Sequence, residues 1–338
     1  MRTLVSCLLA AALLAACGGA DKAGAAPPSE DPVTEARAFV DWYSQTTAGL
    51  EQAATTAYWK AANSGAKADF DAYAAADLAL RTHHSDPERY AQIRRLLQSG
   101  DRLPDLVRRS LEVALLAYQE NQLPRDVLAA MVQKSSAIEQ TFNTFRASLD
   151  GRTWSNNDLL ERIAKETDSA KRQAIWDALK QVGAQVGPQL VELARLRNQA
   201  ARSMGYANYW DMKVRGQEHD PATLIALFDA LEKETDAPFR AMKAELDAEL
   251  SRRFGIPAAE MMPWHYDNPF FQDAPPNEAI DLDVFYEGRT KEDIVELGRA
   301  FFADLGLEFD DIVANSDFFE REGKDQHAFC ITIDRGAD

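Results

Sequence analysis

The chain has 338 residues, of which 37 are Lys or Arg and 54 are Asp or Glu, so its formal net charge at pH 7 is −17. A chain of this length can form one large domain or two and bury most of its unfolded surface. The acidic balance argues against nucleic acid and anionic lipid headgroups as partners, because a negatively charged surface repels both.

The N-terminus has the features of a bacterial export signal. Arg2 supplies a short positive region, and Leu4–Ala16 is an apolar run that is too short to span a bilayer. The residues Leu14–Cys17 (LAAC) resemble a lipobox, in which cleavage before Cys17 exposes a thiol for lipid attachment. Several acyl chains on one residue anchor a protein stably, whereas one chain binds only marginally. The alternative is an ordinary secretory signal with an incidental cysteine.

We expect a signal peptide over residues 1–16 and a lipid-anchored, flexible tether over residues 17–32, which are rich in Ala, Gly and Pro. Gly18, and not Asp, follows the cysteine, which favours the outer membrane for a lipoprotein that faces the periplasm. The membrane is then contacted only through the lipid. Of the three cysteines, only Cys330 is left for pairing, so an intrachain disulfide is not expected.

From Val33 onward, helical spacing of apolar residues dominates the chain, and residues 33–338 are expected to be all-α. Met261–Pro276 contains four prolines and predicts an ordered loop. His83 and His84 come just before a helix start, and we interpret them as exposed polar residues. The first predicted helix begins at a capping box, Ser85–Glu88, and ends at Gly100. Further helices are predicted over residues 104–120 and 124–149, from Ser155, and over residues 169–204, where Pro188 should kink or split the helix. The last three are predicted from Asp220 to Pro238, from there to Gly255, and over residues 290–305.

One segment, Ala328–Ile333 (AFCITI), predicts a β-strand, because it is short, apolar and partly β-branched. The backbone groups of a single strand need a partner. We expect that partner, and the true end of the domain, to lie beyond Asp338. The predicted fold class is therefore all-α with one short β element near the C-terminal end.

The sequence offers little for metal or nucleophilic catalysis. A catalytic zinc site needs three protein ligands and an open position for water, and no two of the histidines are four residues apart. Cys330 follows His327 by three residues, but its apolar surroundings predict a buried structural thiol with a raised pKa. No serine lies in a G-x-S-x-G turn. The five histidines are His83, His84, His219, His265 and His327.

Three segments together resemble a known family. They are Arg197–Tyr206 (RNQAARSMGY), Met262–Phe271 (MPWHYDNPFF) and Ser316–Asp334 (SDFFEREGKDQHAFCITID). They resemble the angiotensin-converting-enzyme-like zinc peptidyl-dipeptidases in their bacterial form, and the resemblance runs from about Arg37 to the final residues. It implies half of a large helical ellipsoid with a deep cleft, and a reaction that removes dipeptides from peptide C-termini. Zinc polarises the scissile carbonyl and activates water in that reaction.

In that family an H-E-x-x-H helix follows a few dozen residues after the stretch that here ends at Asp338. We therefore expect an N-terminal portion that is truncated before its zinc ligands and is inactive by itself. Chloride dependence stays open. Two alternatives are a naturally short, non-catalytic helical lipoprotein that binds peptides or a protein partner, and another zinc oligopeptidase family of similar helical build.

The resemblance also implies site residues. Gln272 matches a loop glutamine that holds the C-terminal carboxylate of the substrate, although one residue fewer separates it from His265; a glutamine bonded to the loop backbone is the alternative. Cys330 and Thr332 match strand positions whose main-chain groups bind the peptide by β-augmentation. Phe329 stands where the animal enzymes have a substrate-binding histidine. Lys180, four residues after Trp176, stands where they have a chloride-binding arginine, and lysine keeps the charge without the planar fork.

Overall fold

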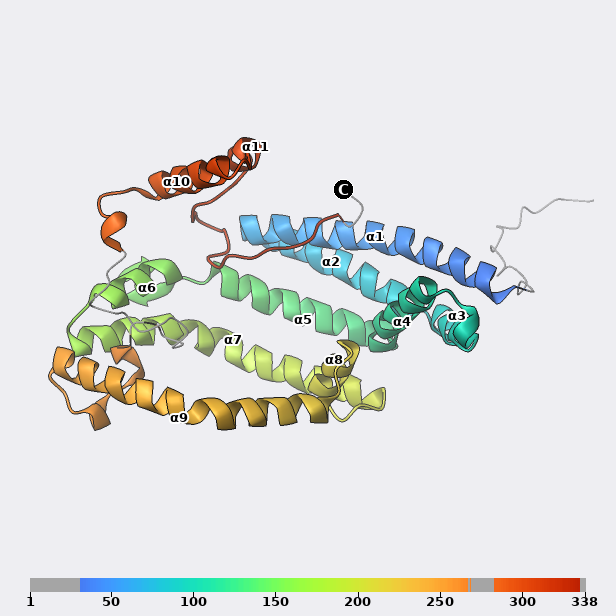
Figure 1. Cartoon of the computed structure of the whole chain (residues 1–338), viewed down its shortest axis with the longest axis horizontal. Helices are drawn as coiled ribbons and strands as arrows, with labels where there is room; N and C mark the ends of the chain where they lie inside the picture. The colour runs from blue at the N-terminus through green and yellow to red at the C-terminus, as the bar shows by residue number, and fades with distance from the viewer. Residues whose placement is uncertain (1–30, 267, 269–282, 335–338) are drawn as a thin grey trace, which may run out of the picture.

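The structure is a computed structural model that describes residues 31–266, 268 and 283–334. Within these residues α-helices predominate and the all-α prediction is confirmed (Figure 1). The helices are α1 Pro32–Ser64, α2 Lys67–His84, α3 Pro87–Leu97, α4 Asp105–Glu120, α5 Arg125–Thr144, α6 Asn156–Lys165, α7 Ser169–Ser203, α8 Tyr209–Gly216, α9 Pro221–Phe254, α10 Lys291–Asp304 and α11 Asp310–Ala314. One hairpin pairs β1 Ala147–Leu149 with β2 Arg152–Trp154, and 3-10 turns lie at Gly100–Arg102, Ala258–Glu260, Pro263–His265 and Asp283–Phe285.

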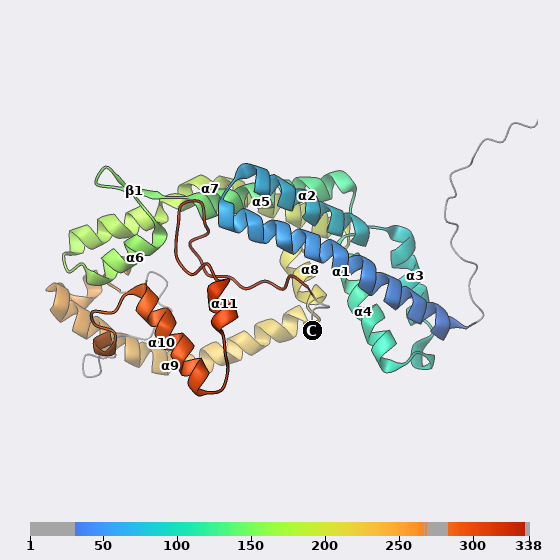
Figure 2. The same ribbon diagram turned by 90° about the horizontal axis from the view of Figure 1, so that it is seen from above.

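The helices α1, α2, α5 and α7 are stacked in that order, as Figures 1 and 2 show. The main core lies where α1, α3 and α4 meet, and Ile93, Leu111 and Tyr118 in it are completely buried. A second core surrounds Leu159 and Ile163 of α6 and Ile175 of α7. These cores form because the apolar residues of each helix recur on one face.

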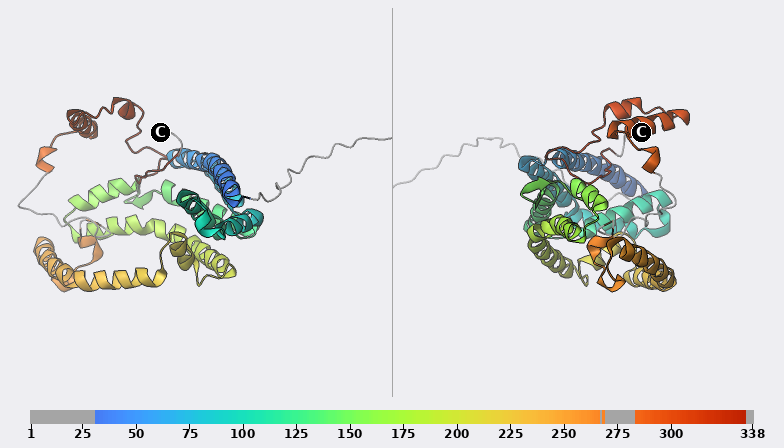
Figure 3. Two further views of the ribbon diagram at one scale, coloured as in Figure 1. Left: turned by 45° about the vertical axis from the view of Figure 1, so that its right-hand side comes forward. Right: turned by 90° about the vertical axis from the view of Figure 1, so that its left-hand side faces the viewer.

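The later helices bury much less. In α9 only Leu246 and Leu250 are buried, and α10 and α11 contain no buried residue. Figure 3 shows α10 and α11 standing off the stack of the other helices. Among the described residues, none of the helices combines the length and the apolarity that crossing a bilayer requires.

Local signals set most helix starts. Ser155 with Asp158 and Thr290 with Asp293 form the reciprocal hydrogen bonds of a capping box at α6 and α10. The start of α3 differs by one residue from the prediction. Asp86, and not Ser85, is the N-cap, because its carboxylate accepts hydrogen bonds from two first-turn N–H groups, whereas Ser85 ends α2.

The internal prolines do not divide the helices. α9 runs without a break through Pro238, so the two helices predicted between Asp220 and Gly255 are one, and α7 likewise continues through Pro188. A proline deletes one backbone hydrogen bond and crowds the preceding turn, but the remaining bonds on both sides preserve a long helix.

One helix prediction and the strand prediction need correction. The helix predicted over 124–149 ends at Thr144, and Asp150 and Gly151 instead form a two-residue hairpin turn in which both φ angles are positive, 53° and 72°. This is the conformation that Asp-Gly favours between two strands. The predicted strand Ala328–Ile333 is wrong, because its backbone joins no β-ladder with any described residue.

The two neighbouring histidines are also corrected. His84 is only 6% exposed, and its Nε2 lies 3.1 Å from the Tyr43 hydroxyl. His83 is half-buried, with Nε2 3.4 Å from Thr47 Oγ1. They are buried because the end of α2 lies between α1 and α4, so both faces of that end meet another helix. Burial lowers the pKa of His83. The charge of Asp86 partly offsets this shift, and the charge of Arg89 adds to it.

Candidate functional site

The C-terminal end of α1 and the segment Ser316–Phe329 border an open pocket of about 730 Å³, here named the α1 pocket. This volume lies in the range of small-molecule and peptide sites. The pocket is lined by Trp59, Asn63, Asn157, Asn315, Ser316, Asp317, Phe318, Glu320, Arg321, Lys324, Asp325, Gln326, His327, Ala328 and Phe329.

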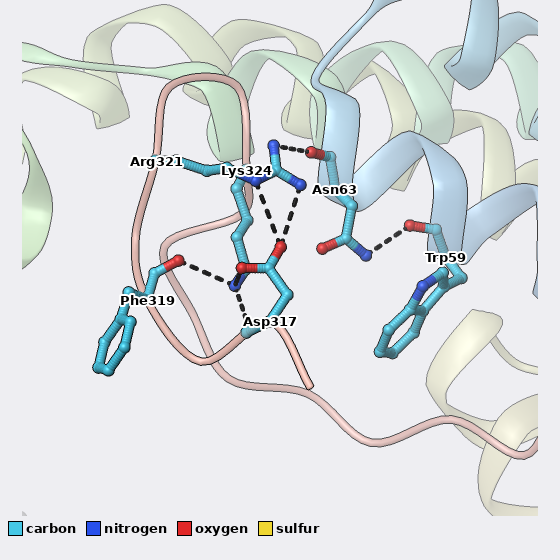
Figure 4. A network of polar contacts seen from close by, with 6 residues as sticks. All are labelled: Trp59, Asn63, Asp317, Phe319, Arg321 and Lys324. Carbon is cyan, nitrogen blue, oxygen red and sulfur yellow. Dashed lines mark hydrogen bonds and ion pairs between the residues drawn. The ribbon is translucent and has the colours of Figure 1, made fainter. Parts of the chain in front are cut away.

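Helix α1 supplies one wall of the pocket. Trp59 and Asn63 are four residues apart and so share a face of the helix. The Asn63 amide donates a hydrogen bond to the Trp59 carbonyl at 2.8 Å, while the indole stays 46% exposed (Figure 4). About half of this side chain is therefore left as an apolar, π-rich surface beside the pocket.

The last carbonyl groups of α1 accept hydrogen bonds from the segment Ser316–Phe329, which forms the opposite wall. A helix leaves its final carbonyl groups without intrahelical partners. Here the Ala62 carbonyl accepts the Asp325 backbone N–H at 2.7 Å, and the Asn63 carbonyl accepts Arg321 Nη1 at 2.7 Å (Figure 4). A cation at this position also interacts favourably with the negative end of the helix dipole.

Two glycines let the walls approach. Gly65, with φ of 65°, ends α1, and Gly323, with φ of 81°, lies against it. A Cβ on Gly65 would lie 2.5 Å from the Gly323 carbonyl oxygen, and a Cβ on Gly323 would lie 2.5 Å from the Ser64 carbonyl oxygen. Only glycine satisfies both the positive φ and the close backbone contact.

Arg321 and Lys324, the two cations of the pocket, both form ion pairs with the carboxylate of Asp317. Lys324 Nζ lies 3.1 Å from Asp317 Oδ1 and also donates to the carbonyls of Asp317 and Phe319, the latter at 3.0 Å. Arg321 Nη2 donates to Asp317 Oδ2 at 3.1 Å (Figure 4). The hydrogen bond from Lys324 holds the pKa of Asp317 below its ordinary value. All three ammonium donors are therefore used inside the segment.

Two other carboxylates in the pocket have only neutral partners among the described residues. Glu320 Oε2 accepts from the Asn157 amide at 2.9 Å, and Asp325 Oδ1 accepts from the His327 backbone N–H at 3.0 Å. Within the described part of the chain neither forms an ion pair. Burial raises the pKa of Glu139, and the negative charge of Asp325 adds to that shift.

Aromatic rings complete the wall near the C-terminal end. Phe329 meets Tyr58 and Trp59 edge to face, with ring centroids 5.4 and 5.5 Å apart. His327 stacks on Phe142 at 5.3 Å. These contacts hold the end of the segment Ser316–Phe329 in place without a β-ladder to any described residue.

A second fixed region is the start of the loop predicted to carry Gln272. Arg172 of α7 is completely buried, and its guanidinium donates to the carbonyl groups of Trp264 at 2.6 Å and Tyr266 at 3.1 Å. The same group also bonds the carbonyls of Ile163 and Glu166 at the end of α6. One buried cation thus joins the loop to two helices, because its charge is shared among carbonyl oxygens.

His265 reinforces this attachment. Its Nδ1 accepts the Met262 backbone N–H at 2.8 Å, which places the ring proton on Nε2, 2.7 Å from Ser169 Oγ. Burial lowers the pKa of His265, and this favours the neutral ring that the two hydrogen bonds require.

The predicted site residues are not assembled together. Gln272 and Cys17 lie outside the described residues. Lys180 Nζ lies 5.3 Å from the ring centroid of Trp176, which in turn contacts Trp264 at 6.1 Å, so this pair adjoins the start of the loop. Cys330 and Thr332 directly follow the pocket but do not line it.

Cys330 is exposed, so the prediction of a buried thiol is wrong. Its backbone joins no β-ladder with a described residue, and so no neighbouring strand of the described chain covers its side chain. Sequence reasoning also missed Trp59, Asn63 and the Asp317 ion cluster. The i,i+4 spacing of Arg321 to Asp317 was the available signal for the cluster, whereas the contact of α1 with residues 316–329 left no trace in local sequence.

The described residues do not supply a zinc site. Nowhere in residues 31–266, 268 and 283–334 do three side chains of His, Cys, Asp or Glu gather in a way that could hold a metal ion. A catalytic zinc needs three such ligands. The described residues therefore do not fit the metal that the family uses.

Comparison with known proteins identifies the family. The family model described as Peptidase M2, angiotensin-converting enzyme, matches residues 30–309. The match contains α1 with Trp59 and Asn63, and it stops before the segment Ser316–Phe329. A comparison with curated proteins found no match. Because the family model covers more than four-fifths of its length, this chain belongs to the angiotensin-converting-enzyme family of peptidases.

Proposed function

We propose that this chain binds peptides in the α1 pocket and belongs to a peptidase that releases dipeptides from peptide C-termini. The observation that carries the proposal is the pocket itself, in a chain of this family. Its volume, its exposed Trp59 and its polar lining suit a short peptide as ligand, whereas a flat protein partner would not fill it.

The segment after Phe329 supports this proposal. Its backbone at Cys330 and Thr332 forms no ladder with any described residue, and both side chains are exposed. Backbone groups in this state can pair with an added peptide strand. Binding and reaction are separate parts of the proposal. The reaction requires zinc, and H-E-x-x-H is absent from these 338 residues, so we expect them to bind peptides without hydrolysing them.

A binding experiment tests the proposal. Fluorescein-labelled hexapeptides with a free C-terminal carboxylate should bind the 338-residue chain in fluorescence anisotropy. Trp59→Ala should weaken binding about tenfold, because a central aromatic contact often dominates a peptide interface. Trp210→Ala is the matched control, since Trp210 is 47% exposed and Trp59 is 46% exposed. Equal losses in both variants, or no binding by the unmodified chain, would contradict the proposal.

Mass spectrometry of the same mixtures, with added zinc and separately with a chelator, tests the reaction. Intact peptides in both samples are expected for these 338 residues. Release of C-terminal dipeptides that stops with the chelator would show that they hold a working zinc site after all.

We also propose that the protein is an exported lipoprotein acylated at Cys17, on the basis of Leu14–Cys17. Intact mass after detergent extraction should show the lipid increment, and Cys17→Ser should move the protein to the soluble fraction. A soluble protein with unmodified Cys17 would contradict this localisation.

A further inference from the structure

The charges of the α1 pocket do not cancel. Arg321 and Lys324 both pair with Asp317, and every nitrogen of these two cations has a bond within the segment or to α1. Glu320 and Asp325 then remain without a cation among the described residues. The lining therefore holds three carboxylates against two cations, and the excess negative charge lies on the side of Glu320 and Asp325.

The aromatic lining adds a second preference for positive charge. The exposed face of Trp59 borders the same pocket as the two carboxylates, and Phe329 stands edge-on beside it. The face of an indole attracts an ammonium or guanidinium group through its quadrupole. Carboxylate and indole surfaces therefore both favour a cation and disfavour an anion.

The neighbouring titratable groups show the same potential. Burial is the main cause of the raised pKa of Glu139 and of Tyr58, Glu139 is the next cause for Tyr58, and the charge of Asp325 adds to both shifts. The charge of Asp325 therefore disfavours a further negative charge close to it. Asp325 also lines the pocket, so the same charge faces a ligand there.

We infer that the α1 pocket is a subsite for a positively charged group of the bound peptide, held between Trp59, Glu320 and Asp325. This inference rests on the proposed peptide binding and adds to it a substrate class. The charged group is a lysine or arginine side chain, or the free amino terminus of the peptide. The C-terminal carboxylate of the peptide is repelled from this pocket and lies elsewhere.

Matched peptides test the inference. The probes are alanine-based, N-acetylated hexapeptides that carry one lysine at successive positions, each paired with a norleucine peptide of the same length. The best lysine peptide should bind about tenfold tighter than its norleucine partner at about 20 mM salt. This advantage should shrink at about 500 mM salt, because screening weakens exposed ion pairs. Peptides with a free amino terminus and no lysine form a further arm that distinguishes the two sources of charge.

Glu320→Gln with Asp325→Asn should abolish the preference for charge, so that the lysine and norleucine peptides bind this variant equally well. The matched controls are Glu234→Gln with Asp229→Asn, since both residues are exposed on α9 and neither forms an ion pair within the described residues. Circular dichroism confirms that the variants fold, and Trp59→Leu gives an independent loss of the preference.

The outcomes separate the two proposals. Equal binding of lysine and norleucine peptides, or a preference that survives the double substitution, overturns the cation subsite and leaves peptide binding intact. If no peptide binds, both the subsite and the proposed function are overturned. A preference carried only by the free amino terminus supports the subsite and identifies that terminus as its occupant.

Discussion

The helices α1–α8 and α9–α11 have similar helical signals but bury very different amounts of surface. In α4, four of 16 residues are buried, whereas α9 buries two of 34 and α10 and α11 bury none. α10 nevertheless has a complete capping box and an apolar stripe that includes Ile294, Leu297 and Phe301. Caps and spacing therefore specify a helix in both regions, but only packing against neighbours makes a core in the first.

The largest expected effect lies where the two regions are joined. Arg172→Ala removes the donor for four buried or half-buried carbonyl groups and opens a cavity between α7 and the loop that follows α9. We expect a loss of roughly 4 kcal/mol in the free energy of unfolding, measured by urea denaturation. Arg195→Ala, an exposed change on the same helix, should cost less than about 0.5 kcal/mol. Similar values for both would show that Arg172 does not hold the loop.

The contrast in burial itself can be measured with a pair of core and surface truncations. Leu111→Ala in α4 should cost about 3 kcal/mol, because Leu111 is completely buried. Phe301→Ala in α10 removes a larger side chain that is 59% exposed, and it should cost about 0.5 kcal/mol or less. A larger loss for Phe301 than for Leu111 would reverse the comparison.

A smaller effect is expected at the wall of the α1 pocket. Gly323→Ala combines a positive φ with a clash against the Ser64 carbonyl, and it should cost about 2 kcal/mol and expose residues 316–329 to proteolysis. Gly288→Ala has the same backbone strain, with φ of 76°, but no atom lies within 4 Å of the added Cβ. It should therefore cost about 1 kcal/mol and leave the segment protected. Equal proteolysis of the two variants would argue against the glycine contact.

The smallest expected effect is a dependence of stability on pH, which arises within the helices α1–α8. Burial lowers the pKa of His83, so the unfolded chain binds more protons than the folded chain below about pH 6.5. Stability should be fully present above that pH and decline as the pH falls through it, seen as a lower Tm at pH 5.5 than at pH 8. His83→Asn should flatten this profile more than His219→Asn, a change at an exposed position. An unchanged profile in His83→Asn would assign the dependence to other groups.

Local chemistry explains which parts of the fold could be predicted. The caps at Ser155 and Thr290 and the left-handed ends at Gly255 and Gly306 are encoded within a few residues, so these boundaries follow from sequence. The hairpin at Asp150–Gly151 was equally local, but Gly151 also fits a helix end, and the wrong alternative was chosen.

Contacts between distant segments could not be predicted in this way. The burial of His84 depends on Tyr43 and Tyr118 of two other helices, and the α1 pocket depends on the match of Gly65 with Gly323. The strand Ala328–Ile333 failed for the same reason, because its apolar pattern is local whereas a ladder requires a neighbour. Of the site residues implied by family resemblance, Lys180 is placed beside Trp176, and Gln272 lies outside the described residues.

The bond between the Asn63 carbonyl and Arg321 has a kinetic consequence. Its partners are 258 residues apart in sequence, so the end of the first helix finds its hydrogen-bond donor only after nearly the whole described chain has been made and brought together. Closing so long a loop is slow relative to helix formation. During refolding, the fluorescence of Trp59 should therefore reach its final value after the far-ultraviolet helical signal, and the pocket should be among the last features of the molecule to form.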